Sequence, residues 1–356
     1  MKPARYLPLG LKVALVAASF SLPIVVLACF VVTNINSDIR FSTLELAGNA
    51  YLRPLEKLLD AVQQYELLVT ASAPADAARC DELAAAIRRE FANLAAVDQK
   101  FGADLQFTEE GLKKRDREHL TVERLSQHWE AIASQPKRTS VAVRTVALDQ
   151  LVASLRETIT HAGDTSNLIL DPDLDSYYLM DVTLLALPQT QDRLAKVIAF
   201  ERERLESGNL SNKDRVQLAV FAAMLAETDL ARVMSSLETS LKEDANFYGA
   251  SPTLLTVYDR GNKEYREQTN EFVDLLRRAS VQEGPDVDPA VFIAAGWKAR
   301  AASFKLWDAC VDELDQLLAT RVADLVMRRT VALAGSGAAL AIACLLALVL
   351  TRSITK

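Results

Sequence analysis

Apolar residues recur at alternating steps of three and four near the C-terminal end of the chain: Phe304, Trp307, Val311, Leu314, Leu318 and Leu325. This spacing is typical of a helix that packs lengthwise against other helices. No proline or turn signal separates it from Val331–Leu350, a run of uncharged residues. At about 1.5 Å rise per residue, such a run covers roughly 30 Å, the thickness of a bilayer core. We therefore predict a helix that leaves a folded domain and crosses a membrane at 330–350.

The N-terminal end of the chain has the same arrangement in reverse order. Leu11–Val32 is a long apolar run with Lys2 and Arg5 before it and Lys12 at its edge, and no further cation occurs until Arg40. The positive-inside rule then predicts a transmembrane helix over 11–32 and a cytoplasmic segment over 1–10. No small-residue cleavage site follows, so we interpret the run as an uncleaved anchor. A second heptad pattern follows it, at Phe41, Leu44, Gly48, Tyr51, Leu55, Leu58, Val62, Tyr65 and Val69.

Residues 33–329, between the two spans, form a series of amphipathic helical patterns separated by turn signals. The breaks are expected at a list of positions along the chain: 72–76, a polar patch with Gly102, Pro136, 163–170, 207–209, 246–252 and 282–289. One charged helix is expected before Pro136, from Thr108 to roughly Ala133. The predicted fold class is all-α: an elongated antiparallel helical bundle between two transmembrane helices, with two stacked four-helix bundles as one form of it. The heptad positions are interpreted either as core within one chain or as part of a dimer interface.

Composition supports helices over strands. Half of the residues are apolar, but aromatic residues make up only 6% and there are just 12 glycines. The formal net charge is −7, and every charged residue outside 33–329 is cationic, so the soluble region is still more acidic. A region of that charge is a poor partner for nucleic acid, which requires clustered Lys and Arg.

Four cysteines divide evenly between the predicted spans and the soluble region. Cys29 and Cys344 lie in the spans, whereas Cys80 and Cys310 lie between them. In an oxidising compartment Cys80 and Cys310 could form the single intramolecular disulfide of that region. Two buried free thiols are the alternative.

The most distinctive polar segment is Asp171–Asp181, which reads Asp-Pro-Asp-Leu-Asp-Ser-Tyr-Tyr-Leu-Met-Asp. It fails as a calcium loop, because Ser176 replaces the required glycine and Val182 stands where a bidentate Glu is needed. Its aspartates are interpreted as a helix start, with Asp171 as N-cap and Pro172 in the first turn. One turn later Tyr177, Tyr178 and Asp181 are candidate ligand-binding residues, with packing in the core as the alternative for the tyrosines.

Tyr51 and Arg53 form a second candidate ligand-binding pair. They precede Pro54, which lies inside the first heptad helix and predicts a kink there. An arginine beside a helix irregularity can hold a carboxylate with two hydrogen bonds if it points into a cavity. The alternative is an ion-paired or solvated side chain.

Catalytic chemistry finds no support in the sequence. The three histidines, His119, His128 and His161, lack the His-Glu-x-x-His spacing of a zinc site. We expect no enzyme activity, no metal and no cofactor.

Three short segments resemble those of bacterial two-span transducers, the methyl-accepting chemotaxis proteins and membrane histidine kinases. Thr351–Lys356 is similar to the opening of a HAMP linker, in which Arg-x-Ile-x-x-Pro follows the second span. The segments Glu45–Leu55 and Asp171–Asp181 resemble parts of their helical periplasmic sensor regions. Together the three cover under a tenth of the chain.

This resemblance implies a homodimer in the bacterial inner membrane, with 33–329 as a periplasmic sensor domain for a small molecule. It further implies that 351–356 begin a HAMP-like linker to a cytoplasmic output module that acts on cytoplasmic signalling proteins. Kinase and chemotaxis outputs remain equally open. The alternative function is a two-span membrane anchor whose helical ectodomain binds a protein partner in a structural or assembly role.

Overall fold

The computed structural model describes residues 9–70, 77–136, 139–206, 210–281 and 288–355. These residues are almost entirely helical and contain no strand, which confirms the all-α prediction. The chain divides into two compact units, residues 1–43 with 319–356 and residues 44–318. The predicted breaks at 72–76, 207–209 and most of 282–289 lie outside the described residues.

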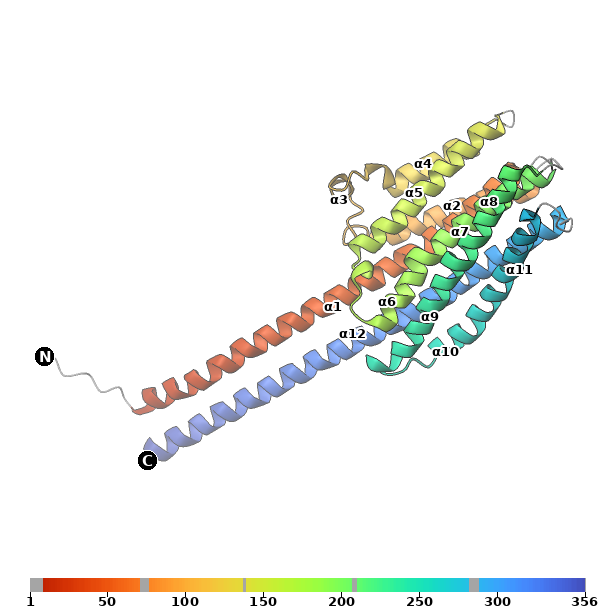
Figure 1. Cartoon of the computed structure of the whole chain (residues 1–356). Helices are drawn as coiled ribbons and strands as arrows, with labels where there is room; N and C mark the ends of the chain where they lie inside the picture. The colour runs from red at the N-terminus through yellow and green to blue at the C-terminus, as the bar shows by residue number, and fades with distance from the viewer. Residues whose placement is uncertain (1–8, 71–76, 137–138, 207–209, 282–287, 356) are drawn as a thin grey trace. The chain divides into compact units, whose positions relative to one another are not determined.

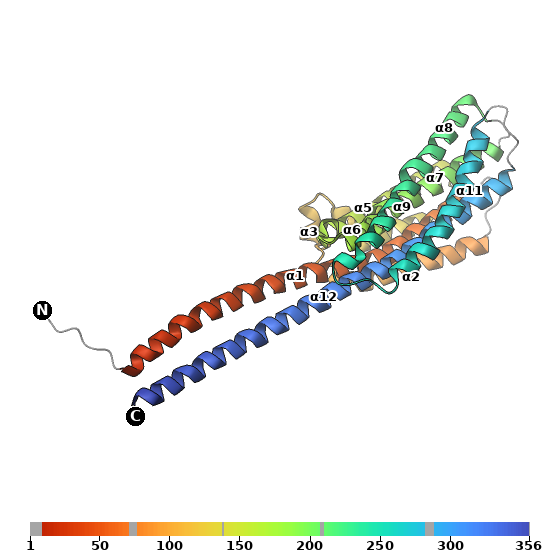
Figure 2. The same ribbon diagram turned by 60° about the horizontal axis from the view of Figure 1, so that its bottom comes forward.

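The first unit consists of the outer parts of the two longest helices, α1 (Leu9–Val69) and α12 (Pro289–Thr355). In this unit they run side by side and antiparallel (Figures 1 and 2), and Arg329 Nη1 donates a 2.9 Å hydrogen bond to Asn36 Oδ1. Both helices carry stretches long and apolar enough to cross a membrane, and these stretches are not buried in the protein. Exposed side chains such as Leu27, Phe30 and Leu345 are what a lipid-facing surface requires.

The second unit combines the inner parts of α1 and α12 with shorter helices (Figure 1). These are α2 (Ala77–Phe101), α3 (Glu109–Lys113), the 3₁₀ turn η1 (Glu118–Leu120), α4 (Val122–Ala133), α5 (Val141–Thr165), the 3₁₀ turn η2 (Leu168–Leu170), α6 (Leu174–Met180), the π-helix η3 (Asp181–Ala186), α7 (Leu187–Glu206), α8 (Asn212–Ala223), the π-helix η4 (Met224–Leu230), α9 (Ala231–Glu243), the 3₁₀ turn η5 (Asp244–Asn246), α10 (Leu254–Thr256), the π-helix η6 (Val257–Gly261) and α11 (Asn262–Ser280).

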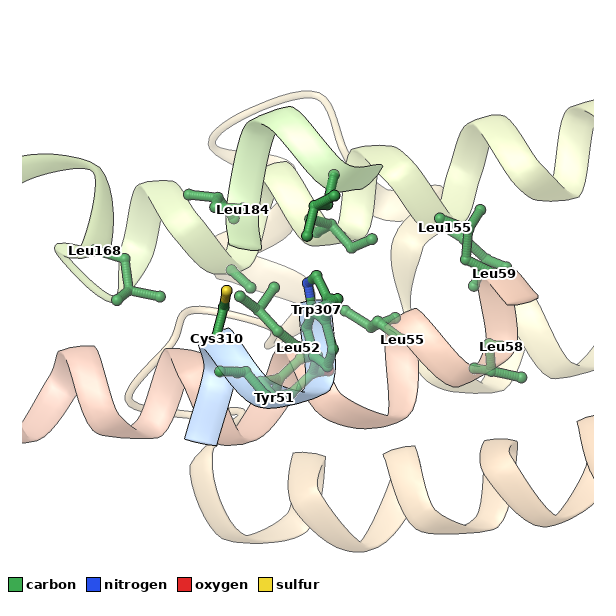
Figure 3. Close-up of a cluster of buried hydrophobic side chains, with 14 of the residues drawn as sticks. Tyr51, Leu52, Leu55, Leu58, Leu59, Leu155, Leu168, Leu184, Trp307 and Cys310 are labelled. Carbon is green, nitrogen blue, oxygen red and sulfur yellow. The ribbon is translucent and has the colours of Figure 1, made fainter. Parts of the chain in front are cut away.

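Heptad residues of both long helices form the core of this unit. Trp307, Val311, Leu314 and Leu318 of α12 are buried, as are Tyr51, Leu55, Leu58 and Val62 of α1. Figure 3 shows Trp307 and Cys310 among the leucines of α1, with Leu184 of η3 nearby. The heptad positions therefore serve as core within one chain.

A layer of buried polar side chains separates two hydrophobic clusters within the second unit. On each of the helices α1, α7, α11 and α12, buried polar residues lie at the boundary between the two clusters. Each is at most 6% exposed: Gln63, Thr190, Gln191, Asp192, Thr269, Arg300 and Ser303. Arg300 donates through Nη1 to Asp60 and through Nη2 to Gln63 Oε1 at 2.9 Å. Gln63 Nε2 in turn donates to Asp192 Oδ1 at 3.3 Å. We call these buried polar residues, together with Asp60, the polar layer.

Two predicted helix boundaries differ from those observed. The single charged helix expected before Pro136 is divided into α3, η1 and α4, because Asp116 adopts a left-handed conformation with φ 55°. The helix predicted to start with Asp171 as N-cap begins only at Leu174. Asp171 has an extended ψ of 122°, as expected for a residue before proline. Its Oδ1 accepts hydrogen bonds from Asp173 N and Ser176 Oγ, which shapes the turn before α6.

The two helical prolines behave differently. The helix α1 continues through Pro54 without interruption. By contrast, Pro188 in the first turn of α7 directly follows the π-helix η3. Because proline has no N–H, it cannot close the α-helical hydrogen bond of the preceding turn. A widened turn before Pro188 is one of the ways in which a helix accommodates that loss.

Candidate functional site

A groove of about 460 Å³ lies between α5 and the segment from η3 to the start of α7, with one residue of α9 at its edge. Its apolar lining comes from Ala153, Ile159, Leu184, Leu185 and Pro188. Its polar lining comes from Arg156, Glu157, Thr160, Gln189 and Arg232. Ligand sites typically combine an apolar lining of this kind with a few polar groups, at volumes of roughly 300–1,000 Å³.

Arg232 is held at the edge of the groove by Asp181. Its Nε and Nη2 donate to Asp181 Oδ2 and Oδ1 at 3.1 and 2.5 Å, and Ser236 Oγ donates to the same carboxylate at 3.0 Å. The hydrogen bond to Asp181 raises the pKa of Arg232, so the guanidinium is permanently charged. This fork fixes the guanidinium plane while the side chain remains 41% exposed.

Arg156 is oriented by a second buried aspartate. Its Nη1 donates to Asp192 Oδ2 at 2.7 Å, and the Arg156 side chain remains 40% exposed. Asp192 also accepts a hydrogen bond from Lys196 at 3.0 Å and one from Gln63 of the polar layer. The groove is thereby connected to the polar layer through a single carboxylate.

The acid in the groove, Glu157, already has two partners that do not line the groove. His119 Nε2 lies 2.9 Å from Glu157 Oε2, and Arg117 Nε lies 3.6 Å from Oε1. The groove therefore presents two oriented guanidinium groups and one carboxylate that is bound elsewhere.

The wall of the groove at η3 contacts α12 directly. In η3 the Leu187 N–H donates to Val182 O, the i→i+5 pattern of a π-helix, and Pro188 has no N–H to offer. Neither residue therefore donates to the Thr183 carbonyl. Trp307 Nε1 of α12 supplies the missing donor at 2.8 Å. Leu184, the next residue, lines the groove.

A second groove, of about 540 Å³, lies between α1 and α2. Some of its charged lining residues form ion pairs: Arg79 with Glu82 at 3.1 Å, and Asp60 with Arg300 of the core. Its apolar lining is mainly alanine. We favour the α5–η3 groove as the candidate site because it has larger apolar side chains, two oriented arginines and direct contact with α12 through η3.

The predicted ligand-binding residues of α1 lie away from that groove. Tyr51 is fully buried, its ring stacks on Phe107 with centroids 4.2 Å apart, and its hydroxyl donates to Asp98 at 2.8 Å. Arg53 forms ion pairs with Asp312 at 2.7 Å and Asp315 at 2.6 Å, both on α12. In the structure this arginine links the two long helices, which corresponds to the ion-paired alternative.

The predicted residues of the second segment lie closer to the groove. Asp181 binds Arg232, one of the lining residues, as described above. Tyr177 and Tyr178 are half-buried and form an edge-to-face pair with centroids 5.4 Å apart. Neither tyrosine lines the groove. The structure thus places Asp181 behind the groove, as a positioning partner for its arginine.

Cys310 on α12 is a free thiol, and no disulfide joins it to Cys80 on α2. Cys310 is fully buried, and burial raises the pKa of its thiol, which leaves it protonated and unreactive. Among the residues that the structure describes, no group of His, Cys, Asp and Glu side chains has the arrangement of a metal site.

Arg156 and Arg232 were not among the residues that the sequence pointed to. Each lies in an ordinary amphipathic helix, and the partners Asp192 and Asp181 are 36 and 51 positions away. Comparison of the chain with protein-family models, with curated proteins and with solved structures found no match.

Proposed function

We propose that this chain is the sensory part of a transmembrane signal transducer, which detects a small molecule outside the cytoplasm. The observation that carries the proposal is the length of α12. It runs as one helix from Pro289 to Thr355, through the core position of Trp307 and through a stretch apolar enough to cross a membrane. A continuous helix transmits a displacement of its core end to its other end, because its backbone hydrogen bonds leave no compliant joint.

The candidate groove supplies an input for such a displacement. A ligand in the groove contacts Leu184 and Leu185 of η3, and the neighbouring Thr183 carbonyl holds Trp307 of α12. A ligand changes the position of α12 only if it binds one arrangement of η3 more tightly than another. A π-turn is suited to that role, since π-turns inside α-helices occur frequently at functional sites.

The remaining parts of the proposal follow from the resemblance to two-span transducers. The groove then faces the periplasm of a bacterium, the spans lie in the inner membrane, and the chain acts as a homodimer. The segment that starts at Thr351 leads to a HAMP-like linker and an output module of the kinase or chemotaxis type. The two apolar helices support the membrane placement.

Disulfide crosslinking tests this function. Asn36→Cys and Arg329→Cys replace two hydrogen-bonded residues of α1 and α12 next to the apolar stretches. The full chain, with its four native cysteines replaced, is reconstituted in nanodiscs and screened with organic acids, amino acids, amines and sugars. The transducer predicts that a compound that raises the Tm also changes the crosslinking rate. Compounds that raise the Tm but leave the rate unchanged, or a complete lack of response, would favour the membrane-anchor alternative.

A further inference from the structure

We propose that the α5–η3 groove binds an organic carboxylate with an apolar body, recognised by Arg156 and Arg232. The inference rests on the proposed function for its role, since it names the ligand class of the same sensor. Its physical basis is local: two guanidinium groups of fixed orientation beside an apolar wall.

Both arginines line the groove and have donors that their aspartates do not use. Arg232 uses Nε and Nη2 for Asp181, and its Nη1 donates to no acceptor among the described residues. Arg156 donates only through Nη1, so its Nε and Nη2 also have no acceptor among the described residues. A carboxylate accepts two parallel N–H bonds from such a fork, and these bonds are stronger than those between neutral groups. The aspartates behind each arginine fix the fork before the ligand arrives, which lowers the entropy lost on binding.

The charge balance favours a single carboxylate over a more highly charged anion. Asp181 and Asp192 offset the charges of the two arginines, and the third carboxylate of the groove, Glu157, is paired with Arg117. The groove therefore supplies oriented donors rather than a large positive potential. A phosphate or polyanion would gain the same hydrogen bonds but meet stronger repulsion from the three carboxylates.

The apolar wall determines the other half of the ligand. Leu184, Leu185 and Pro188 face Ala153 and Ile159 across the groove. An alkyl or aryl group that covers them removes apolar surface from water at roughly 25 cal/mol per Å². Contact with Leu184 also places the ligand against η3, the segment that holds Trp307.

Asp192 allows a matched pair of variants. It accepts hydrogen bonds from two cations, Arg156 and Lys196, at 2.7 and 3.0 Å. Arg156→Gln and Lys196→Gln each remove one cation and leave the other, so the buried Asp192 carboxylate keeps a cationic partner in both variants. Only Arg156 lines the groove. The two variants separate loss of binding from loss of support for Asp192.

The experiment uses the full chain in nanodiscs and measures binding of hexanoate, benzoate and phenylacetate by calorimetry. The neutral controls are hexanamide, benzamide and phenylacetamide. We expect at least one acid to bind and its amide to bind at least tenfold more weakly. Arg156→Gln should weaken that acid about tenfold, the order expected for a hydrogen bond to a charged group, and Lys196→Gln by less than about twofold.

Three results would overturn the inference: no binding of any of the three acids at millimolar concentration, equal binding of acid and amide, or equal losses in the two variants. The crosslinking experiment keeps the two proposals apart. A neutral or cationic compound that alters the Asn36→Cys/Arg329→Cys rate overturns the carboxylate inference and leaves the transducer standing. An acid that binds through Arg156 without altering that rate supports the inference and counts against the transducer.

Discussion

Trp307 Nε1 donates a 2.8 Å hydrogen bond to the Thr183 carbonyl, so that a side chain of α12 completes the backbone hydrogen bonding of the π-helix η3. Two local features leave that carbonyl available: the π-pattern bond from Leu187 and the absence of an N–H on Pro188. The relationship makes η3 and α12 mechanically dependent on each other, because movement of either one separates a buried donor from a buried acceptor.

Replacement of Trp307 by Phe should therefore destabilise the second unit. Phe retains most of the apolar surface but leaves the Thr183 carbonyl without its donor, at a cost of about 1–3 kcal/mol plus a smaller packing loss. The measurement is the denaturation midpoint of the full chain in nanodiscs. Trp129→Phe is the matched control, because Trp129 is equally buried and its Nε1 has no hydrogen-bond partner among the described residues. Equal losses in the two variants would contradict the role of the Thr183 bond.

Substitution of Gly163 by Ala should disturb η3 from the opposite side. A Cβ at this position of α5 would overlap the side chain of Leu184. We expect a net destabilisation of about 1–2 kcal/mol, since the overlap outweighs the better helix propensity of alanine. The thermal midpoint measures it. Gly335→Ala serves as the control, because no atom lies within 4 Å of its added Cβ; a neutral Gly163→Ala would show that Leu184 is free to move.

Arg53→Ala should weaken the link between α1 and α12. Arg53 binds Asp312 and Asp315, and Asp315 also accepts a 2.7 Å hydrogen bond from Asn49, which is fully buried. The expected loss is about 1 kcal/mol, because Arg53 is one-third exposed and water screens the pairs. The variant Arg88→Ala breaks a more exposed pair with Glu130 and should cost less. Urea titration of both variants distinguishes them, and the reverse order would contradict the prediction.

Stability should fall as pH rises through the range in which Glu56 ionises. Its carboxyl is buried in the core, and burial is the largest of the effects that together raise its pKa to about 8. Asp60 and Asp308 act in the same direction as burial, whereas Gln191 and Arg300 oppose it. Because the pKa of the folded protein lies above the unfolded value, the stabilising contribution is full below pH 4.5. It is lost as pH rises through about 8.

Glu56→Gln tests this linkage, since glutamine keeps the shape but cannot ionise. The variant should gain stability relative to the parent chain at pH 9, on the order of a few kcal/mol, and much less at pH 5. Melting curves of the full chain across that range provide the measurement. The control Glu227→Gln changes an exposed side chain and should leave the pH profile unaltered. A parallel shift of parent and variant at every pH would exclude Glu56 as the titrating group.

The sequence predicted the helical class and the long heptad helices because these depend on regular spacing. Trp307, Val311 and Leu314 are buried as the three-four pattern requires. The π-helices left no such signal, since an i→i+5 turn changes hydrogen bonding without a change in apolar period. The predicted role of Tyr51 rested on its proximity to Arg53 and Pro54, whereas its stacking on Phe107 depends on a distant helix connection. Arg156 and Arg232 share a groove only through tertiary packing, which no local pattern encodes.

The polar layer sets a limit on how far α12 can slide. Arg300 is 2% exposed, and its acceptors on Asp60 and Gln63 are fixed on α1. A shift by one full helical turn, about 5.4 Å, would pull the buried guanidinium away from both of these acceptors, which are the partners that offset the cost of burying its charge. The layer therefore favours a single lengthwise position of α12 against α1.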